Sequence, residues 1–133
     1  MRIYLLCFLL ILPLTLLADV VDIDAHQLNE MMEQDVVIID VRTPGEWQQT
    51  GIVEGSIPIM FFNERNQPLA DEWLAQASEH VSKDKKLILI CRTGNRSGAI
   101  ANYLVKVQGY QDVLNVKGGI VSWKRAGYKT VKP

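Results

Sequence analysis

A cysteine followed by an arginine- and glycine-rich segment is the part of this sequence whose residue types best suit chemistry. Cys91 ends the apolar run Leu87–Ile90. The six residues that follow it are Arg92, Thr93, Gly94, Asn95, Arg96 and Ser97, and a helical pattern begins at Gly98. Backbone N–H groups just before a helix have no helical partners, and the helix dipole adds partial positive charge there. A sulfur in this position therefore lies among donors that suit an anion.

The composition of the loop favours a reactive thiol. Gly94 and Gly98 relax the steric limits of a tight turn, so successive amides can point inward as an anion nest. Such donors favour a thiolate over a thiol, and Arg92 and Arg96 can add charge and forked hydrogen bonds to an oxyanion. The sequence predicts a nucleophilic sulfur at the base of an anion-binding loop. The alternative interpretation is a buried, inert Cys91 with two surface arginines beside it.

Other groups that activate or recruit a thiol are missing from the sequence near this loop. The chain has 2 cysteines, and Cys7 lies in the N-terminal apolar segment. Cys91 therefore has no Cys-x-x-Cys neighbour and no set of zinc ligands. His26 and His80 fall on predicted helices, and we interpret both as solvated side chains. No Gly-Lys-Ser/Thr follows, which excludes a Walker-type phosphate loop. We expect the loop itself to activate the thiol, with no metal or organic cofactor.

Strands and helices must alternate along the chain to place this loop at the edge of a sheet. The apolar pattern predicts strands at residues 20–23, 36–41, 56–59, 86–91 and 113–117. It predicts a helix that follows the N-cap Asp24 and ends near Gln34, and a short one from Pro44 after the cap Thr43. Further helices are predicted at 68–81 and 98–108, followed by an amphipathic turn with Ile120 and Trp123. This alternation predicts an α/β domain with a mainly parallel central sheet flanked by helices. Ligands of such sheets bind at the carboxyl ends of the strands.

The first 18 residues have the layout of a secretory signal peptide. Arg2 supplies a positive charge, residues 3–17 are almost wholly apolar, and Ala18 precedes Asp19. This apolar run is shorter than the roughly 20 residues of a spanning helix. We expect cleavage after Ala18, export to a bacterial periplasm and a single mature domain at residues 19–133 without stable membrane insertion. A retained anchor is the alternative. The mature chain would keep Cys91 as one unpaired thiol in an oxidising compartment.

The overall composition limits the classes of partner. The chain has 133 residues, a formal net charge of −1 and 48% hydrophobic residues, as expected of one globular domain. No long basic stripe is present, which argues against a nucleic-acid partner. Any anion that the protein binds is therefore expected to be held by a local site. A free domain of this size is expected to be a monomer.

Four segments resemble the hallmarks of the rhodanese-like sulfurtransferase family, in the family's order. Residues 38–42 (IIDVR) with Glu46 and Trp47 are similar to its Asp-Val-Arg segment and the acidic-aromatic pair that follows. Residues 51–57 (GIVEGSI) resemble its Gly-His-Ile-x-Gly-Ala-x segment, without the usual histidine. Residues 91–97 (CRTGNRS) match the catalytic loop, and residues 116–119 (VKGG) with Trp123 match the closing hallmark.

The resemblance implies an activity and a role for each site residue. Cys91 would attack the outer sulfur of a donor such as thiosulfate, and the resulting persulfide would pass that sulfur to cyanide or a thiol. The amides of residues 92–97 would cradle the persulfide, with Ser97 donating a hydrogen bond to the sulfur and Arg92 and Arg96 attracting the anionic donor. Asp40, Arg42 and Glu46 would be supporting residues, with Arg42 paired to Glu46. The side chains of Trp47, Trp73 and Trp123 would pack in the core.

Two other functions are compatible with part of the pattern. Cysteine phosphatases have a similar loop, with five residues between the nucleophile and the arginine that clamps phosphate. Only four residues separate Cys91 from Arg96 here, and Ser97 occupies the position of that arginine. The shorter loop is expected to be too tight for a phosphoryl group and to hold a single sulfur. The second alternative is a non-catalytic module that binds sulfane sulfur, an oxyanion or a partner protein.

Overall fold

Five parallel strands form the centre of the protein. The computed structural model describes residues 11–13 and 18–133. In chain order the elements are β1 (Val21–Ile23), α1 (Ala25–Met31), β2 (Val37–Asp40), α2 (Pro44–Thr50), β3 (Ile57–Pro58), α3 (Ala70–Ser78), β4 (Lys86–Ile90), α4 (Asn95–Lys106), β5 (Asp112–Val116) and α5 (Gly119–Arg125). The strands lie in the order β1-β5-β4-β2-β3, and every pair is parallel. The predicted α/β class with a mainly parallel sheet is confirmed.

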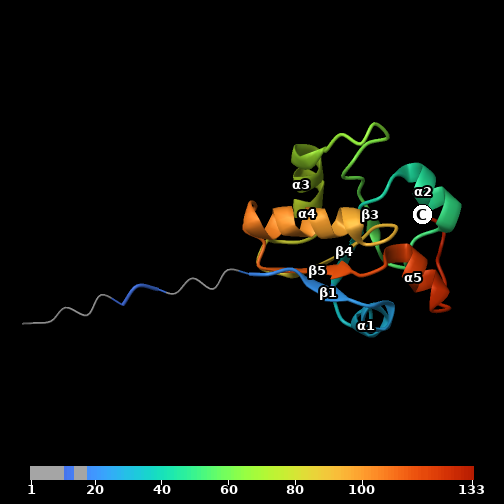
Figure 1. The fold of residues 1–133 in the computed structure, drawn as a ribbon, viewed down its shortest axis with the longest axis horizontal. Coiled ribbons are helices and arrows are strands. Elements are labelled where there is room, and N and C mark those ends of the chain that lie inside the picture. The colour runs from blue at the N-terminus through green and yellow to red at the C-terminus, as the bar shows by residue number, and fades with distance from the viewer. Residues whose placement is uncertain (1–10, 14–17) are drawn as a thin grey trace, which may run out of the picture.

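The sheet carries a hydrophobic core on each face. Successive residues of a strand point to opposite faces, and β4 shows this directly. Leu87 and Leu89 pack with side chains of α3 and α4, whereas Ile88 and Ile90 pack with side chains of α1 and α5. Figure 1 shows α3 and α4 on one side of the strands and α1 and α5 on the other. Both faces of the central strand are thus covered, which accounts for its uninterrupted apolar sequence.

Several helices and strands begin or end at other residues than predicted, and one of these differences affects the site. Helix α4 begins at Asn95 rather than at Gly98, because Gly94 adopts the left-handed conformation (φ 93°) and turns the chain into the helix three residues earlier. The chain that links β4 to α4 is therefore only residues 91–94. The expected terminal turn is the regular helix α5. Strand β3 is limited to Ile57–Pro58, which pair with Ile39 and Asp40 of β2.

The N-terminal segment lies mostly outside the described residues. The expected signal peptide spans residues 1–18, of which the structure describes only 11–13 and 18, and Cys7 is not among them. Within the described part of the chain, every helix is too short or too polar to traverse a bilayer.

Candidate active site

Cys91 lies at the carboxyl end of β4, the middle strand of the sheet. It is a buried free thiol, with 1% of the residue exposed. Its Sγ accepts a hydrogen bond from the backbone N–H of Gly94 at 3.1 Å, and the hydroxyl of Ser97 lies 3.2 Å away. These two contacts come from the loop and from the first turn of α4. The loop and the first turn of α4 thus enclose the sulfur.

The start of α5 fixes the backbone of this loop. The N–H groups of Ile120 and Val121 donate to the carbonyl oxygens of Cys91 and Arg92 at 2.9 and 3.2 Å. A Cβ atom on Gly119, whose φ is 54°, would lie 2.4 Å from the carbonyl oxygen of Cys91 and 2.5 Å from the carbonyl carbon of Arg92. Only a glycine permits this approach. The Gly118-Gly119 pair of the sequence is thus explained by contact with the backbone of the cysteine loop.

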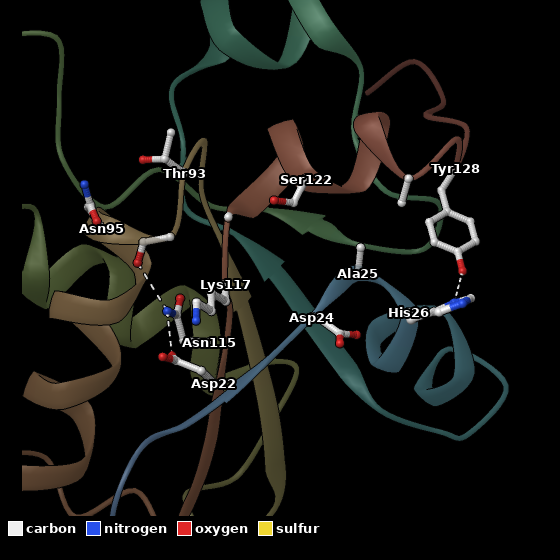
Figure 2. Close-up of a pocket in the computed structure, with 13 residues that line it drawn as sticks. Asp22, Asp24, Ala25, His26, Thr93, Asn95, Asn115, Lys117, Ser122 and Tyr128 are labelled. Carbon is white, nitrogen blue, oxygen red and sulfur yellow. Dashed lines mark hydrogen bonds between the residues drawn. The ribbon is translucent and has the colours of Figure 1, made fainter.

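A buried polar network behind the sulfur was not predicted from the sequence. Ser97 Oγ lies 2.6 Å from Oδ1 of Asn115 on β5. The Asn115 amide nitrogen donates to the Asp22 carboxylate at 3.0 Å and to the carbonyl of Gly94 at 3.2 Å. Figure 2 shows these last two bonds side by side. The available signal was Asn115 itself, one polar residue inside the apolar run of residues 113–116.

Arg96 is held by an ion pair that the sequence assigned differently. Its guanidinium makes two hydrogen bonds to the Glu46 carboxylate, at 2.9 and 2.5 Å, and so ties α4 to α2. The hydrogen bond from Arg96 is the main reason that the pKa of Glu46 falls from 4.5 to about 2. The same contact raises the pKa of Arg96. The positive charge of Arg96 is therefore largely balanced by Glu46.

Arg42 pairs with Asp40, so the expected pairing of Arg42 with Glu46 is wrong. The chain turns inward after β2, which buries both side chains, at 1% and 0% exposed, with Arg42 Nη2 2.8 Å from Asp40 Oδ2. Arg42 Nη1 donates to Thr50 Oγ1 at 2.8 Å. Trp47 was expected to be simple core packing, but its indole N–H donates to Asp40 Oδ1 at 3.1 Å. Asp40 is thus the buried acceptor that joins β2 to α2.

The other two tryptophans agree with the prediction. Trp73 and Trp123 are both buried, in the cores on opposite faces of the sheet.

Two hollows lie against the cysteine loop and differ in charge. The smaller, about 390 Å³, is lined by Gln49, Thr50, Arg92, Ile120, Val121 and Lys124. Neither Arg92 nor Lys124 forms an ion pair with any residue in the described part of the chain. The larger hollow, about 820 Å³, has Thr93 and Asn95 in its wall. Arg92 thus lines a different hollow from Thr93, Gly94 and Asn95, which follow it in the chain.

The larger hollow also contains polar groups of β1 and α1. Asp22, Asp24 and His26 line it together with Lys117 and Tyr128, as Figure 2 shows. His26 is exposed, in line with the interpretation as a solvated side chain, and its Nδ1 is hydrogen-bonded to the hydroxyl of Tyr128. His80, the other histidine, is likewise exposed and lies just after α3.

Comparison with known proteins identifies the family and the fold. The family model described as a rhodanese-like domain matches residues 24–126. A sulfurtransferase of Allochromatium vinosum is 34% identical over 84% of this chain and 95% of its own length. The thiosulfate sulfurtransferase GlpE of Pseudoalteromonas translucida is 31% identical over 77% of this chain and 86% of its own. The crystal structure of a rhodanese-related protein from Thermoplasma volcanium is 31% identical, with a TM-score of 0.65 over 85% of this chain and 99% of that chain. The chain thus belongs to the rhodanese-like family.

Proposed function

We propose that the protein is a sulfurtransferase that carries sulfane sulfur on Cys91, from a thiosulfate-like donor to a thiol or cyanide. One observation supports this most strongly. The Cys91 sulfur is buried at the end of β4, accepts a hydrogen bond from a backbone N–H at 3.1 Å, and has no second cysteine in the loop beside it. Relatives named sulfurtransferase and thiosulfate sulfurtransferase are similar to this chain over most of their length.

The proposed reaction proceeds in two displacements at sulfur. The Cys91 thiolate attacks the outer sulfur of thiosulfate, the S–S bond of the donor breaks, and sulfite leaves with the electron pair. The loop amides stabilise the negative charge of the resulting persulfide. Cyanide or a thiolate then attacks the terminal sulfur, and the electron pair of the second S–S bond returns to Cys91 as a thiolate. Thiocyanate or an acceptor persulfide is released, and no external oxidant or reductant is needed.

The charges around the loop suggest how the donor arrives. Arg96 is occupied by Glu46, so we assign the first attraction of the anion to Arg92 and Lys124 in the 390 Å³ hollow. Partly exposed cations raise the local concentration of a small anion and are screened by salt. The same occupation of Arg96 argues against phosphatase chemistry, because a phosphoryl group needs a free arginine fork to clamp its oxygens.

We also propose that residues 1–18 direct export and are removed after Ala18, on the basis of their sequence pattern. The test is the N-terminal sequence of the protein recovered from the periplasmic fraction of an expressing bacterium. A start at Asp19 supports the proposal, and an intact N-terminus in the membrane fraction supports the retained anchor.

The sulfur-transfer proposal is tested by turnover. Purified protein is given thiosulfate and cyanide, thiocyanate is measured, and Cys91→Ser is run in parallel. Thiocyanate formation that requires Cys91 is the expected result. Hydrolysis of a phosphate ester in place of sulfur transfer would show that the loop-length argument is wrong. Inactivity in both assays, with thiosulfate still leaving a persulfide on Cys91, would favour a sulfur-binding module over an enzyme.

A further inference from the structure

A chain of hydrogen bonds connects the Cys91 sulfur to the carboxylate of Asp22 on β1. It runs from Cys91 through Ser97 and Asn115 to Asp22, with successive distances of 3.2, 2.6 and 3.0 Å. Ser97 is 0% and Asn115 is 5% exposed, whereas Asp22 is exposed and lines the larger hollow. Buried polar groups of this kind must be fully satisfied, so each hydrogen in the chain has an assignable position.

The direction of each hydrogen follows from the partners of Asn115. Its amide nitrogen carries two hydrogens, and both of its neighbours, the Asp22 carboxylate and the Gly94 carbonyl, are acceptors only. The oxygen of the amide must then face Ser97, and it can only accept. A hydroxyl has a single hydrogen, and the 2.6 Å contact with Asn115 has the length of a good O–H···O bond. Ser97 therefore donates to Asn115 and turns a lone pair toward the sulfur.

In this arrangement Ser97 offers the sulfur an acceptor and not a donor. The S–H of Cys91 can donate to Ser97, but a thiolate has no hydrogen to give and needs donors. For Ser97 to donate to a thiolate, its hydrogen must leave Asn115, which strands a buried carbonyl oxygen. That Ser97 donates to a persulfide sulfur stays a prediction, for which its hydroxyl lies at a suitable distance of 3.2 Å from Sγ. The Gly94 N–H, at 3.1 Å, stays directed at the sulfur in either state.

We propose that Asn115, oriented by Asp22 and the Gly94 carbonyl, is a positioning residue that competes with the Cys91 sulfur for the hydroxyl hydrogen of Ser97 and so restrains Ser97 from donating to the sulfur. The proposal deepens the proposed sulfur transfer. It requires only that Cys91 be reactive, and it does not depend on which molecule donates the sulfur.

Several other charged groups lie around the cysteine loop and must be held constant in any test. Arg96 on α4 interacts electrostatically with both Cys91 and Asp40, and it is paired with Glu46 on α2. Asp40, the last residue of β2, is paired with Arg42. Arg92 adjoins Cys91 in sequence, and Lys117 after β5 lines the hollow on the side of Asp22. None of these residues is changed in the variants below, so differences between variants report on the hydrogen-bond chain.

The test is the pH dependence of alkylation of Cys91 by iodoacetamide. It is measured on the full chain by mass spectrometry of the peptide that contains Cys91, which separates it from Cys7. Asn115→Leu has a similar volume but no acceptor, so the Ser97 hydrogen is free to reach the sulfur. We expect the midpoint of the pH profile to fall by about 0.5–1 unit, with roughly a three- to tenfold faster reaction below the midpoint. An unchanged or higher midpoint would overturn the proposal.

A double variant tests whether Asn115 acts through Ser97. In a Ser97→Ala background no hydroxyl hydrogen remains to be redirected, so adding Asn115→Leu should leave the midpoint where Ser97→Ala puts it. An equal fall in both backgrounds would show that Asn115 acts on the sulfur without Ser97, and the proposal would be wrong.

A milder pair of variants covers the case in which Asn115→Leu does not fold. Asp22→Asn replaces a charged acceptor with a weaker neutral one, which loosens the hold on the Asn115 amide. Asp24→Asn removes the same charge from the wall of the same hollow. Asp24 is the N-cap of α1 and accepts a hydrogen bond from the Gln27 N–H, a role in which asparagine serves equally well. We expect the midpoint to fall in Asp22→Asn and to change less in Asp24→Asn. Equal shifts would mean that charge alone acts, which contradicts the proposed chain.

The readout separates this inference from the function that it builds on. Alkylation needs neither thiosulfate nor cyanide, so a failure of turnover would leave these profiles interpretable. Conversely, an unchanged profile in Asn115→Leu would leave the sulfur-transfer proposal standing.

Discussion

Removal of the Asp40 carboxylate should be among the most destabilising single changes in this protein. The side chain is 0% exposed and accepts from Arg42 Nε at 2.9 Å and from Arg42 Nη2 at 2.8 Å, and from the Trp47 indole at 3.1 Å. Asp40→Ala therefore leaves a buried guanidinium without its counter-charge. Breaking a buried pair from one side costs about 3–5 kcal/mol. This is a large fraction of the roughly 5–15 kcal/mol that stabilises a typical domain.

Urea unfolding followed by tryptophan fluorescence measures this loss. The matched control is Asp112→Ala, which breaks the Lys86–Asp112 pair on the same sheet, where the two side chains are 39% and 42% exposed. Exposed pairs contribute about 0–1 kcal/mol, so we expect the control to unfold almost as the parent does. In the double variant Asp40→Leu with Arg42→Met both charges are gone, and we expect most of the stability to return.

The size of the difference decides whether the reasoning is correct. A loss below about 1 kcal/mol in Asp40→Ala, similar to Asp112→Ala, would mean that the pair is not the desolvated anchor that its burial implies. A double variant less stable than Asp40→Ala alone would refute the account in a second way, because it would show that the unpaired charge is not the source of the loss.

Three further changes have expected outcomes. Gly119→Ala should lower thiocyanate formation more than tenfold, because its Cβ would meet the backbone of Cys91 and Arg92, whereas Gly109→Ala, also at positive φ (74°) but with free space around it, should keep the activity. The ordinary pKa of Glu46 is 4.5 and its folded pKa is about 2, so its ion pair stabilises the fold fully above pH 4.5 and is lost as the pH falls toward 2. The stability difference between the parent and Glu46→Gln, at most about 1 kcal/mol for this partly exposed pair, should therefore shrink over that interval in urea titrations; a difference independent of pH would contradict the assignment. Arg92→Gln should raise KM for thiosulfate about fivefold at low salt and much less at high salt, and an unchanged KM would place the attraction elsewhere.

Strand positions were predictable because buried strands consist mostly of apolar residues. The run of residues 87–90 is apolar throughout, since helices cover both faces of β4. Cys91 directly follows this run and precedes glycines and a helical pattern. The loop at the end of β4 could therefore be located from the sequence as well. Helix α1 was predictable from local chemistry, as Asp24 and Gln27 form a capping box with two bonds of 2.8 Å.

The pairing of charged residues was not predictable, because it depends on the fold. Glu46 and Arg96 are 50 residues apart in sequence, and nothing local distinguishes Arg42 from Arg96 as the partner of Glu46. The direction of the chain after β2 decides this, since it buries Arg42 against Asp40 and leaves Glu46 facing α4. Asn115 was missed for a related reason. Its importance comes from Ser97 and Asp22, which lie beside it only once β1, β5 and α4 have assembled.

The most direct test of the central proposal is the mass of the protein after incubation with thiosulfate in the absence of any acceptor. The account predicts the addition of one sulfur atom, located on the peptide that contains Cys91, together with one equivalent of sulfite. Cyanide should then remove this sulfur and release thiocyanate. Cys91→Ser should gain no mass under the same conditions. An unmodified parent protein, or the same gain in Cys91→Ser, would contradict the assignment of Cys91 as the sulfur carrier.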